Sequence, residues 1–166
     1  FFWDVTDPGN IKKIDSVKVD ARTVNDVKVS KDGRISVISR EGASNRKNGI
    51  IILDVTNPFD VKILSEYTKN LTGGVHNVFI DNNHVYALSG SQRYYIINIE
   101  DPKNPVEVGM FEVGKEGQSI HDVWIEDGIA YSSNWRDGVY LVDVGNGIAG
   151  GSPSNPVAFA NYDYAT

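Results

Sequence analysis

The sequence predicts an all-β protein built from repeated four-stranded antiparallel units, and three observations carry this prediction. A strand-like motif that ends in Asp or Asn recurs at intervals of about 45 residues along the chain. An alternating segment that begins with His or Asn recurs in phase with that motif. No segment has the spacing of apolar residues that an amphipathic helix requires.

The first recurring motif is an apolar strand that ends at an Asp or Asn. It is clearest at residues 49–54 and 138–143, and shorter forms occur at 95–98 and 2–4. The strand is almost continuously apolar, as expected when both faces of a sheet are covered. The four terminal residues are Asp4, Asp54, Asn98 and Asp143. We predict that each caps local backbone, because a calcium site gathers several carboxylates within about a dozen residues.

The second recurring motif begins with Asn25, His76 or His121 and starts an alternating segment. A short turn of Asp, Asn and Gly follows each segment, and these residues tolerate positive φ and favour tight hairpins. Together the two motifs give four strands per unit. In the third unit the strands are predicted at residues 75–81, 84–89, 94–99 and 106–113. Four-stranded antiparallel units of about 45 residues are typical of a β-propeller.

The repeats divide the chain into about three and a half propeller blades of one incomplete domain. The expected boundaries are 1–20 for a partial blade, then 21–68, 69–113 and 114–166. Because propellers have about 4–8 blades, these units cannot close a ring by themselves. We favour a segment of a longer polypeptide that forms a larger closed propeller. The alternatives are two copies that complete a ring of about seven blades, or an open sheet whose unpaired edge another protein covers.

Composition excludes several classes of function. The chain of 166 residues contains no Cys, which excludes disulfides, thiolate catalysis and zinc sites built from Cys. Its net charge of −6 argues against non-specific binding of nucleic acid, which needs surplus positive charge. The longest aliphatic run, residues 50–53, is too short to span a bilayer, so we expect no transmembrane segment in this chain.

Several of these segments together resemble the LVIVD-repeat family of proteins. The strands at 50–55 and 140–144 resemble the repeat that names the family, and the segment at His121, the segment 142–147 and the turn 101–105 are similar to its other motifs. The resemblance covers nearly the whole chain, although the first unit lacks its two inner strands. It implies a β-propeller in an extracellular, cell-surface or periplasmic protein of bacteria or archaea. The biochemical role of that family is mostly unassigned.

His76 and His121 occupy equivalent places at the start of an innermost strand, and Asn25 takes that place in the preceding unit. In a propeller such side chains lie near the axis, where a ring of imidazoles would bind a transition metal. We favour a different interpretation, in which the His-Asp or His-Asn pair hydrogen-bonds neighbouring backbone and fixes blade packing. Because an amide is a poor ligand for zinc or copper, Asn25 weakens the metal interpretation further, and no metal or cofactor is predicted.

The loops between the second and third strands of the units each carry an Arg. In propeller topology these loops lie on the same face as the starts of the innermost strands, so their side chains are expected beside the two histidines. Arg and Trp are enriched at binding hot spots, and function usually sits on loops over a rigid scaffold. The candidate binding residues are Arg40, Arg46, Arg93, Trp135, Arg136, His76 and His121. The competing interpretation is that these Arg side chains are solvated or pair with acids such as Glu41 or Asp137.

Two other features are assigned to structure rather than to function. The Gly-rich segment 144–152 is followed by neither a helix nor a Gly-Lys-Ser/Thr motif. It is therefore interpreted as a long flexible connector before the last strand and not as a phosphate-binding loop. Trp3 and Trp124 lie in alternating strands and are expected to pack between blades.

The favoured function is that of a non-catalytic binding or assembly module of the cell envelope or exterior. No catalytic constellation appears in the sequence, and polar loops collect on one face of a repetitive scaffold. A protein partner or an extracellular polymer is expected to bind that face. The first alternative is an enzyme of lyase or hydrolase type at the channel mouth, with His76 and His121 as acid/base groups or metal ligands, which rests on fold analogy. The second is an accessory subunit of a large envelope complex.

Overall fold

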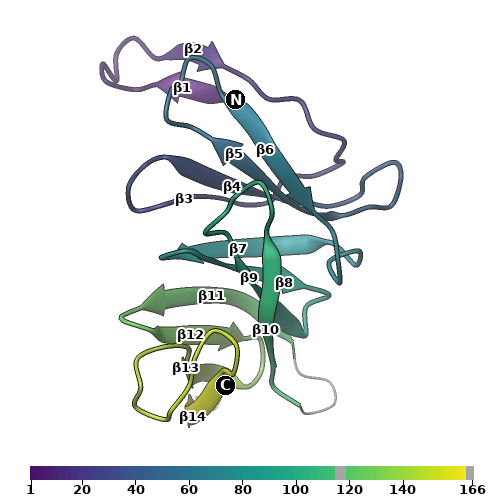
Figure 1. The fold of residues 1–166 in the computed structure, drawn as a ribbon, viewed down its shortest axis with the longest axis vertical. Coiled ribbons are helices and arrows are strands. Elements are labelled where there is room, and N and C mark those ends of the chain that lie inside the picture. The colour runs from purple at the N-terminus through teal and green to yellow at the C-terminus, as the bar shows by residue number, and fades with distance from the viewer. Residues whose placement is uncertain (115–118, 164–166) are drawn as a thin grey trace.

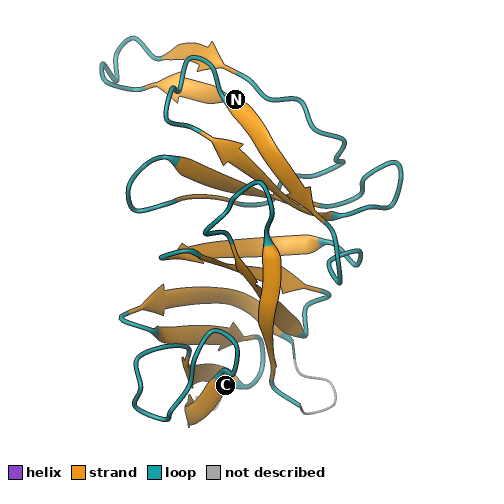
Figure 2. Cartoon of the chain, viewed as in Figure 1, coloured by secondary structure: helices purple, strands orange, loops and turns teal. Residues whose placement is uncertain are grey.

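The computed structural model describes residues 1–114 and 119–163, and these residues form strands and loops without any helix. They build three antiparallel sheets of four strands and one of two strands (Figures 1 and 2). Within each four-stranded sheet every strand pairs with the next one along the chain. The prediction of an all-β protein made of four-stranded antiparallel units is therefore confirmed. The described residues accordingly contain no helix long and apolar enough to cross a membrane.

Each sheet lies within one of the four residue ranges expected from the repeats. The strands are β1 (Phe2–Asp4) and β2 (Lys12–Asp15); β3 (Val27–Val29), β4 (Ile35–Arg40), β5 (Gly49–Asp54) and β6 (Lys62–Tyr67); β7 (Val75–Asp81), β8 (His84–Ser89), β9 (Arg93–Asn98) and β10 (Val106–Glu112); and β11 (Ile120–Glu126), β12 (Ile129–Asn134), β13 (Gly138–Asp143) and β14 (Val157–Tyr162). The four strands predicted in the third unit are β7 to β10, and no predicted boundary differs by more than one residue.

The sheets follow one another in chain order along the long axis of the molecule, and apolar side chains fill the space between neighbours (Figure 1). Strand β5 shows why the third strands are continuously apolar. Its Ile50 and Ile52 belong to the cluster shared with the β7–β10 sheet, whereas Ile51 and Leu53 belong to the cluster on the β1–β2 side. Because successive side chains of a strand point to opposite faces, a strand covered on both faces needs apolar residues at every position.

The last sheet exposes a face that the two preceding sheets bury. Val37 on β4 pairs with Lys28 on β3, and Tyr86 on β8 pairs with Phe79 on β7. Val37 and Tyr86 therefore hold equivalent positions in their sheets, and Tyr86 is only 1% exposed. The corresponding residue of the last sheet, Tyr131 on β12, is 36% exposed. In the two preceding sheets this position is covered by the sheet that follows. The last sheet therefore presents an apolar face with the same geometry as two buried interfaces.

The two tryptophans expected between the sheets differ in their surroundings. The Trp124 ring meets Phe79 of the preceding sheet edge-on, with ring centroids 4.9 Å apart, although the residue is 58% exposed. Trp3 does not pack between sheets. Its ring lies 6.5 Å from that of Phe1 in the same segment, and more than half of the residue is exposed. The reason is strand alternation, since Phe2 is the residue of β1 that turns toward the next sheet.

Candidate functional site

Four side chains from three successive sheets form a continuous exposed row, here called the histidine row. It consists of Asn25 before β3, His76 on β7, His121 on β11 and Trp135 after β12. The Asn25 amide nitrogen lies 3.4 Å from His76 Nδ1, and the centroids of the His76 and His121 rings are 5.4 Å apart. Trp135 lies edge-to-face against His121 at 4.6 Å. The sequence prediction that the two histidines and Asn25 hold equivalent, neighbouring places agrees with this geometry.

The row is held by the backbone beneath it. Ser39 Oγ of β4 accepts hydrogen bonds from the backbone N–H groups of Asn25 and Asp26. At the other end of the row, the Trp135 N–H donates to the Ser119 carbonyl, and the Ile120 N–H donates to the Ser91 carbonyl of the preceding sheet. These bonds fix the loops to the starts of the innermost strands, so the row has a rigid support.

Asp26 links two sheets directly beneath the row. Its Oδ2 accepts a hydrogen bond of 3.0 Å from the Val78 N–H of β7, and its Oδ1 accepts from the Val27 N–H. The Lys28 ammonium binds the same carboxylate at 2.8 Å. The acid that follows Asn25 therefore fixes packing between sheets. The His76-Asn77 and His121-Asp122 pairs do not make this bond, which corrects the favoured interpretation: Asn77 Oδ1 is buried without a partner among the described residues, and Asp122 Oδ1 accepts from Val123 of its own strand.

We predict that Asp26→Ala lowers the free energy of unfolding by about 1.5 kcal/mol, because it removes a charge-assisted hydrogen bond between sheets. Asp122→Ala is the matched control, since Asp122 holds the same position in the last sheet and accepts a hydrogen bond from its own neighbour Val123. Urea unfolding of both variants measures the difference. Equal losses in the two variants would show that the contact with Val78 contributes nothing.

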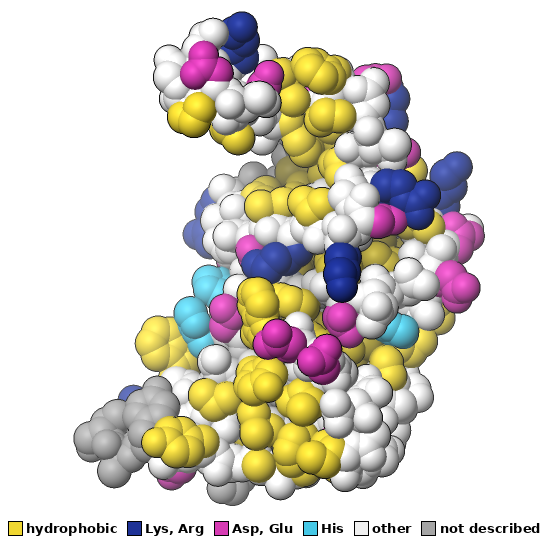
Figure 3. All heavy atoms as spheres, turned by 90° about the vertical axis from the view of Figure 1, so that its left-hand side faces the viewer, with side chains coloured by type: hydrophobic (Ala, Val, Ile, Leu, Met, Phe, Trp, Pro, Cys, Tyr) yellow, Lys and Arg dark blue, Asp and Glu magenta, His cyan; other side chains and the backbone are white. Residues whose placement is uncertain are grey.

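A carboxylate lies close to the histidine row. Among the described residues, the carboxylate oxygen nearest to His76 Nδ1 is Glu41 Oε1, at 4.0 Å. Within the part of the chain that the structure describes, no group of three His, Cys, Asp or Glu residues stands close enough to hold a metal ion. The row therefore offers ring edges, one amide and exposed aromatic surface, which suit contacts with a partner or polymer. Figure 3 shows two adjacent histidine side chains at the left margin of the molecule, beside hydrophobic and acidic side chains, and a further histidine apart from them on the right.

Arg40 does not lie at this surface, which corrects the sequence prediction. The residue is 2% exposed, and its Nη1 donates to Glu66 on β6 of the same sheet at 2.7 Å. Its Nε and Nη2 atoms are buried without a hydrogen-bond partner among the described residues. Arg40 ends β4, and its side chain runs inside the molecule toward β6 instead of outward with the loop. Arg40 is therefore a structural cation.

The other predicted arginines differ in whether an acidic side chain pairs with them and in how exposed they are. Arg93 pairs with Glu112 at 2.9 Å, its direct neighbour across β9 and β10. The interpretation that a local acid binds Arg93 is thus correct, although the acid is neither of the two proposed. Arg46 is exposed in the loop after β4, and Arg136 is exposed next to Trp135. The geometry thus places Trp135 beside His121, and Arg136 follows Trp135 in the same loop.

A hollow of about 640 Å³ adjoins the end of the row. Its lining residues are Ser119, Trp135, Arg136 and Asp137. Trp135 is 64% exposed, so a large indole face is available to a ligand at this point. The hollow and the exposed indole together leave this end of the row open to a ligand.

The four strand-end residues are caps, as predicted. The side-chain Oδ1 of each accepts a hydrogen bond from the backbone N–H two residues further on, over distances of 2.8–3.0 Å. The residues are Asp4, Asp54, Asn98 and Asp143. Hydrogen bonds from Thr6 and Thr56 lower the pKa of Asp4 and Asp54. Each cap is explained by its own turn and needs no bound cation.

The Gly-rich segment after β13 is not a flexible connector, which is the second correction. It curls around the buried carboxylate of Asp143, which accepts backbone N–H groups from Gly145, Gly147, Ala149 and Gly151. Burial alone raises the pKa of Asp143, but these four donors outweigh it and hold the pKa far below its ordinary value. Gly147 adopts a φ of 91°, which a residue with a side chain rarely does, and this explains one glycine of the segment.

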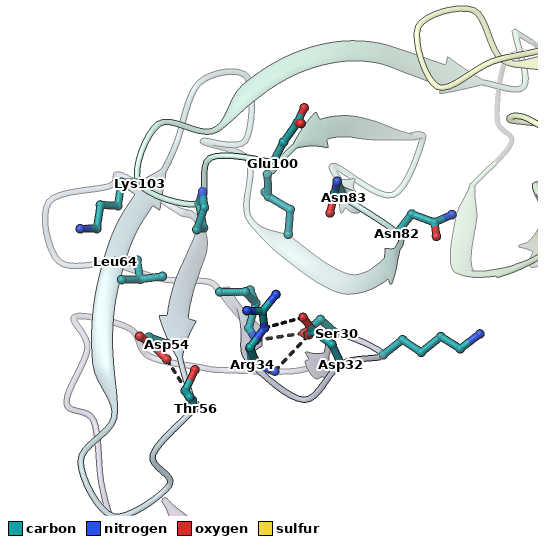
Figure 4. A pocket seen from close by; sticks show the side chains of 14 residues that line it. Ser30, Asp32, Arg34, Asp54, Thr56, Leu64, Asn82, Asn83, Glu100 and Lys103 are labelled. Carbon is teal, nitrogen blue, oxygen red and sulfur yellow. Dashed lines mark hydrogen bonds and ion pairs between the residues drawn. The ribbon is translucent and has the colours of Figure 1, made fainter.

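A pocket at the opposite end of the strands was not predicted. It has a volume of about 580 Å³ and lies between the β3–β6 and β7–β10 sheets (Figure 4). The β3–β4 turn, the end of β5 and the turn after β9 supply most of its lining. The sequence marks each of these segments as a turn. These turns form a pocket only because the two sheets pack together, and the sequence of a single turn does not predict that packing.

Comparison of the sequence with models of known protein families finds no match, and a search among curated proteins finds no significant relative. The resemblance to the LVIVD-repeat family therefore remains an expectation from the motifs themselves.

Proposed function

We propose that this chain is part of a β-propeller that acts as a non-catalytic binding or assembly module outside the cytoplasm. The histidine row and the adjoining Arg136 form its docking surface for a protein partner or an extracellular polymer. One observation carries the proposal: side chains from three successive sheets meet in one exposed, backbone-supported row. Binding surfaces of this kind use exposed aromatic rings and Arg as anchors.

The propeller assignment is supported by the repetition of one interface. The first two four-stranded sheets each pack an apolar face on the sheet that follows, and equivalent residues meet at both junctions: Asn25 with His76, and His76 with His121. The exposed apolar face with Trp124 and Tyr131 suits a further sheet of the same kind, which the remainder of the chain's own propeller would supply. The resemblance to the LVIVD-repeat family supports the location outside the cytoplasm. An accessory subunit of an envelope complex would use the same surface.

The docking surface is tested with immobilised protein exposed to the envelope proteins and, separately, to the extracellular polysaccharide of the source cells. We expect the double variant Trp135→Ala, Arg136→Ala to retain at least tenfold less of the bound partner, since hot-spot residues contribute about 2 kcal/mol or more each. Its melting temperature should stay unchanged because both side chains are exposed.

Glu126→Ala is the matched control, because Glu126 is exposed at the opposite end of the strand that carries His121. Its capture should equal that of the unmodified chain. Undiminished capture by the Trp135, Arg136 double variant would exclude the row as the docking surface.

A further inference from the structure

The lining of the pocket between the β3–β6 and β7–β10 sheets includes Arg34, whose side chain forms one ion pair and is 70% exposed. Arg34 Nε donates to Asp32 Oδ2 at 2.7 Å, and no described residue accepts a hydrogen bond from the two Nη atoms. Asp32 is itself held by the Ser30 hydroxyl at 2.6 Å and by the Arg34 backbone N–H at 3.1 Å. The turn that carries the guanidinium thus orients it, and both Nη groups, a planar fork of four N–H donors, are left for a ligand.

The fork keeps this arrangement over a wide pH range. The Ser30 hydroxyl, followed by Arg34, lowers the pKa of Asp32 to about 2. With this pKa, the Asp32 carboxylate stays ionised at neutral pH. The Arg34 guanidinium does not lose its proton, so the ion pair keeps both charges.

The rest of the lining is partly apolar, and its charged side chains balance one another. Leu64, Ile35, Ile99 and Pro102 provide the apolar lining. Three cationic and three acidic side chains also line the pocket: Lys31, Arg34, Lys103, Asp32, Asp54 and Glu100. Figure 4 shows the Arg34 guanidinium directed into the space between Leu64 and Asn83, while the ends of Glu100 and Lys103 point away from it. Such a balance disfavours a multiply charged ligand.

We propose that this pocket binds a monocarboxylate with a branched aliphatic group, whose carboxylate takes the two Nη donors of Arg34 and whose aliphatic group lies on Leu64 and Ile99. A carboxylate is the planar acceptor that fits the fork. The volume of about 580 Å³ lies within the range of small-molecule sites, about 300–1,000 Å³. The same chemistry is offered by a free short-chain acid and by the C-terminus of a peptide that ends in Leu.

This site does not depend on the proposed function. Ser30 to Arg34 join the far ends of β3 and β4, whereas the histidine row lies at the start of β3. A variant that empties the pocket should therefore leave the row, and capture by the row, unaffected.

The test is NMR titration of the chain with N-acetyl-leucine, with N-acetyl-leucinamide as the probe that lacks the carboxylate. We expect the acid to shift the amide signals of the pocket with a Kd of about 1 mM or tighter. The amide should bind at least tenfold more weakly. Arg34→Gln, and Arg34→Lys, which keeps the charge but loses the fork, should each weaken binding of the acid tenfold or more. Arg22→Gln is the control, because Arg22 is an exposed arginine outside the pocket.

Two further probes separate the possible sources of the carboxylate. Isovalerate represents a free acid, and the tripeptide Ala-Ala-Leu represents a peptide C-terminus; whichever binds more tightly identifies the source. No shift of pocket signals with about 10 mM N-acetyl-leucine would overturn the proposal. Equal binding of the acid and the amide, or undiminished binding by Arg34→Gln, would overturn it as well.

Discussion

Replacing Asp143 with Ala is expected to lower the melting temperature by about 10 °C or more, because several buried N–H donors lose their acceptor at once. The carboxylate is fully buried and organises the whole segment from Gly145 to Gly151. Without it the segment has no fixed path between β13 and β14. Differential scanning calorimetry measures the effect.

Asp54→Ala is the matched control, because Asp54 holds the same repeat position and caps a single N–H, that of Thr56. Its melting temperature should fall much less than that of the Asp143 variant. Similar losses in the two variants would show that the bonds to the Gly-rich segment do not stabilise the fold.

The stabilisation by Asp143 should also depend on pH in a defined direction. Its pKa is depressed in the folded state, so its contribution is fully present above the unfolded pKa of about 4. The contribution is lost as the pH falls below that value toward the folded pKa. The difference in melting temperature between the unmodified chain and Asp143→Asn should therefore shrink between about pH 5 and pH 2. A difference that stays constant over this interval would contradict the account.

Removing Glu66 is expected to be the second large loss. Glu66 is the hydrogen-bonded partner of the buried Arg40 guanidinium, and its removal leaves a buried cation without this direct counter-charge. Because Glu66 itself is half exposed, we expect Glu66→Ala to cost about 3 kcal/mol of unfolding free energy, at the lower end for a broken buried pair. Chemical denaturation with urea gives this value.

Arg40→Met provides the decisive comparison, since it removes the cation together with its two unpartnered buried nitrogens. We expect this variant to be as stable as the unmodified chain or more stable, because an apolar residue of similar length can replace a buried pair. In the Arg40→Met background, Glu66→Ala should have little further effect. A loss on Arg40→Met as large as that on Glu66→Ala would show that the ion pair itself stabilises the protein.

Sequence alone predicts the features that repeat and that depend on neighbours in the chain. The period of the motifs places the four-stranded units, and the alternation of residues places β7 and β8 at their observed boundaries. The caps at Asp4 and Asp54 follow from the same logic, since the donor lies two residues away. The neighbourhood of His76 and His121 is predictable because equivalent positions of stacked repeats must adjoin.

The features that sequence does not predict depend on groups far apart in the chain. Arg40 pairs with Glu66 across two strand pairings, so the loop that follows Arg40 gives no sign of its burial. The path of the Gly-rich segment depends on an acid that also fits the simple cap pattern, Asp143. The pocket around Arg34 forms where two sheets meet, and its lining comes from turns that look ordinary one by one.

A crystal structure of the natural polypeptide tests most directly whether these sheets are blades of one propeller with the histidine row at its mouth. The decisive quantity is the exposure of Tyr131, which is 36% here against 1% for the equivalent Tyr86. A propeller predicts that a further sheet of the same kind covers Tyr131 and buries it as fully as Tyr86. A Tyr131 that stays open to solvent, or that an unrelated element covers, would contradict the proposed architecture.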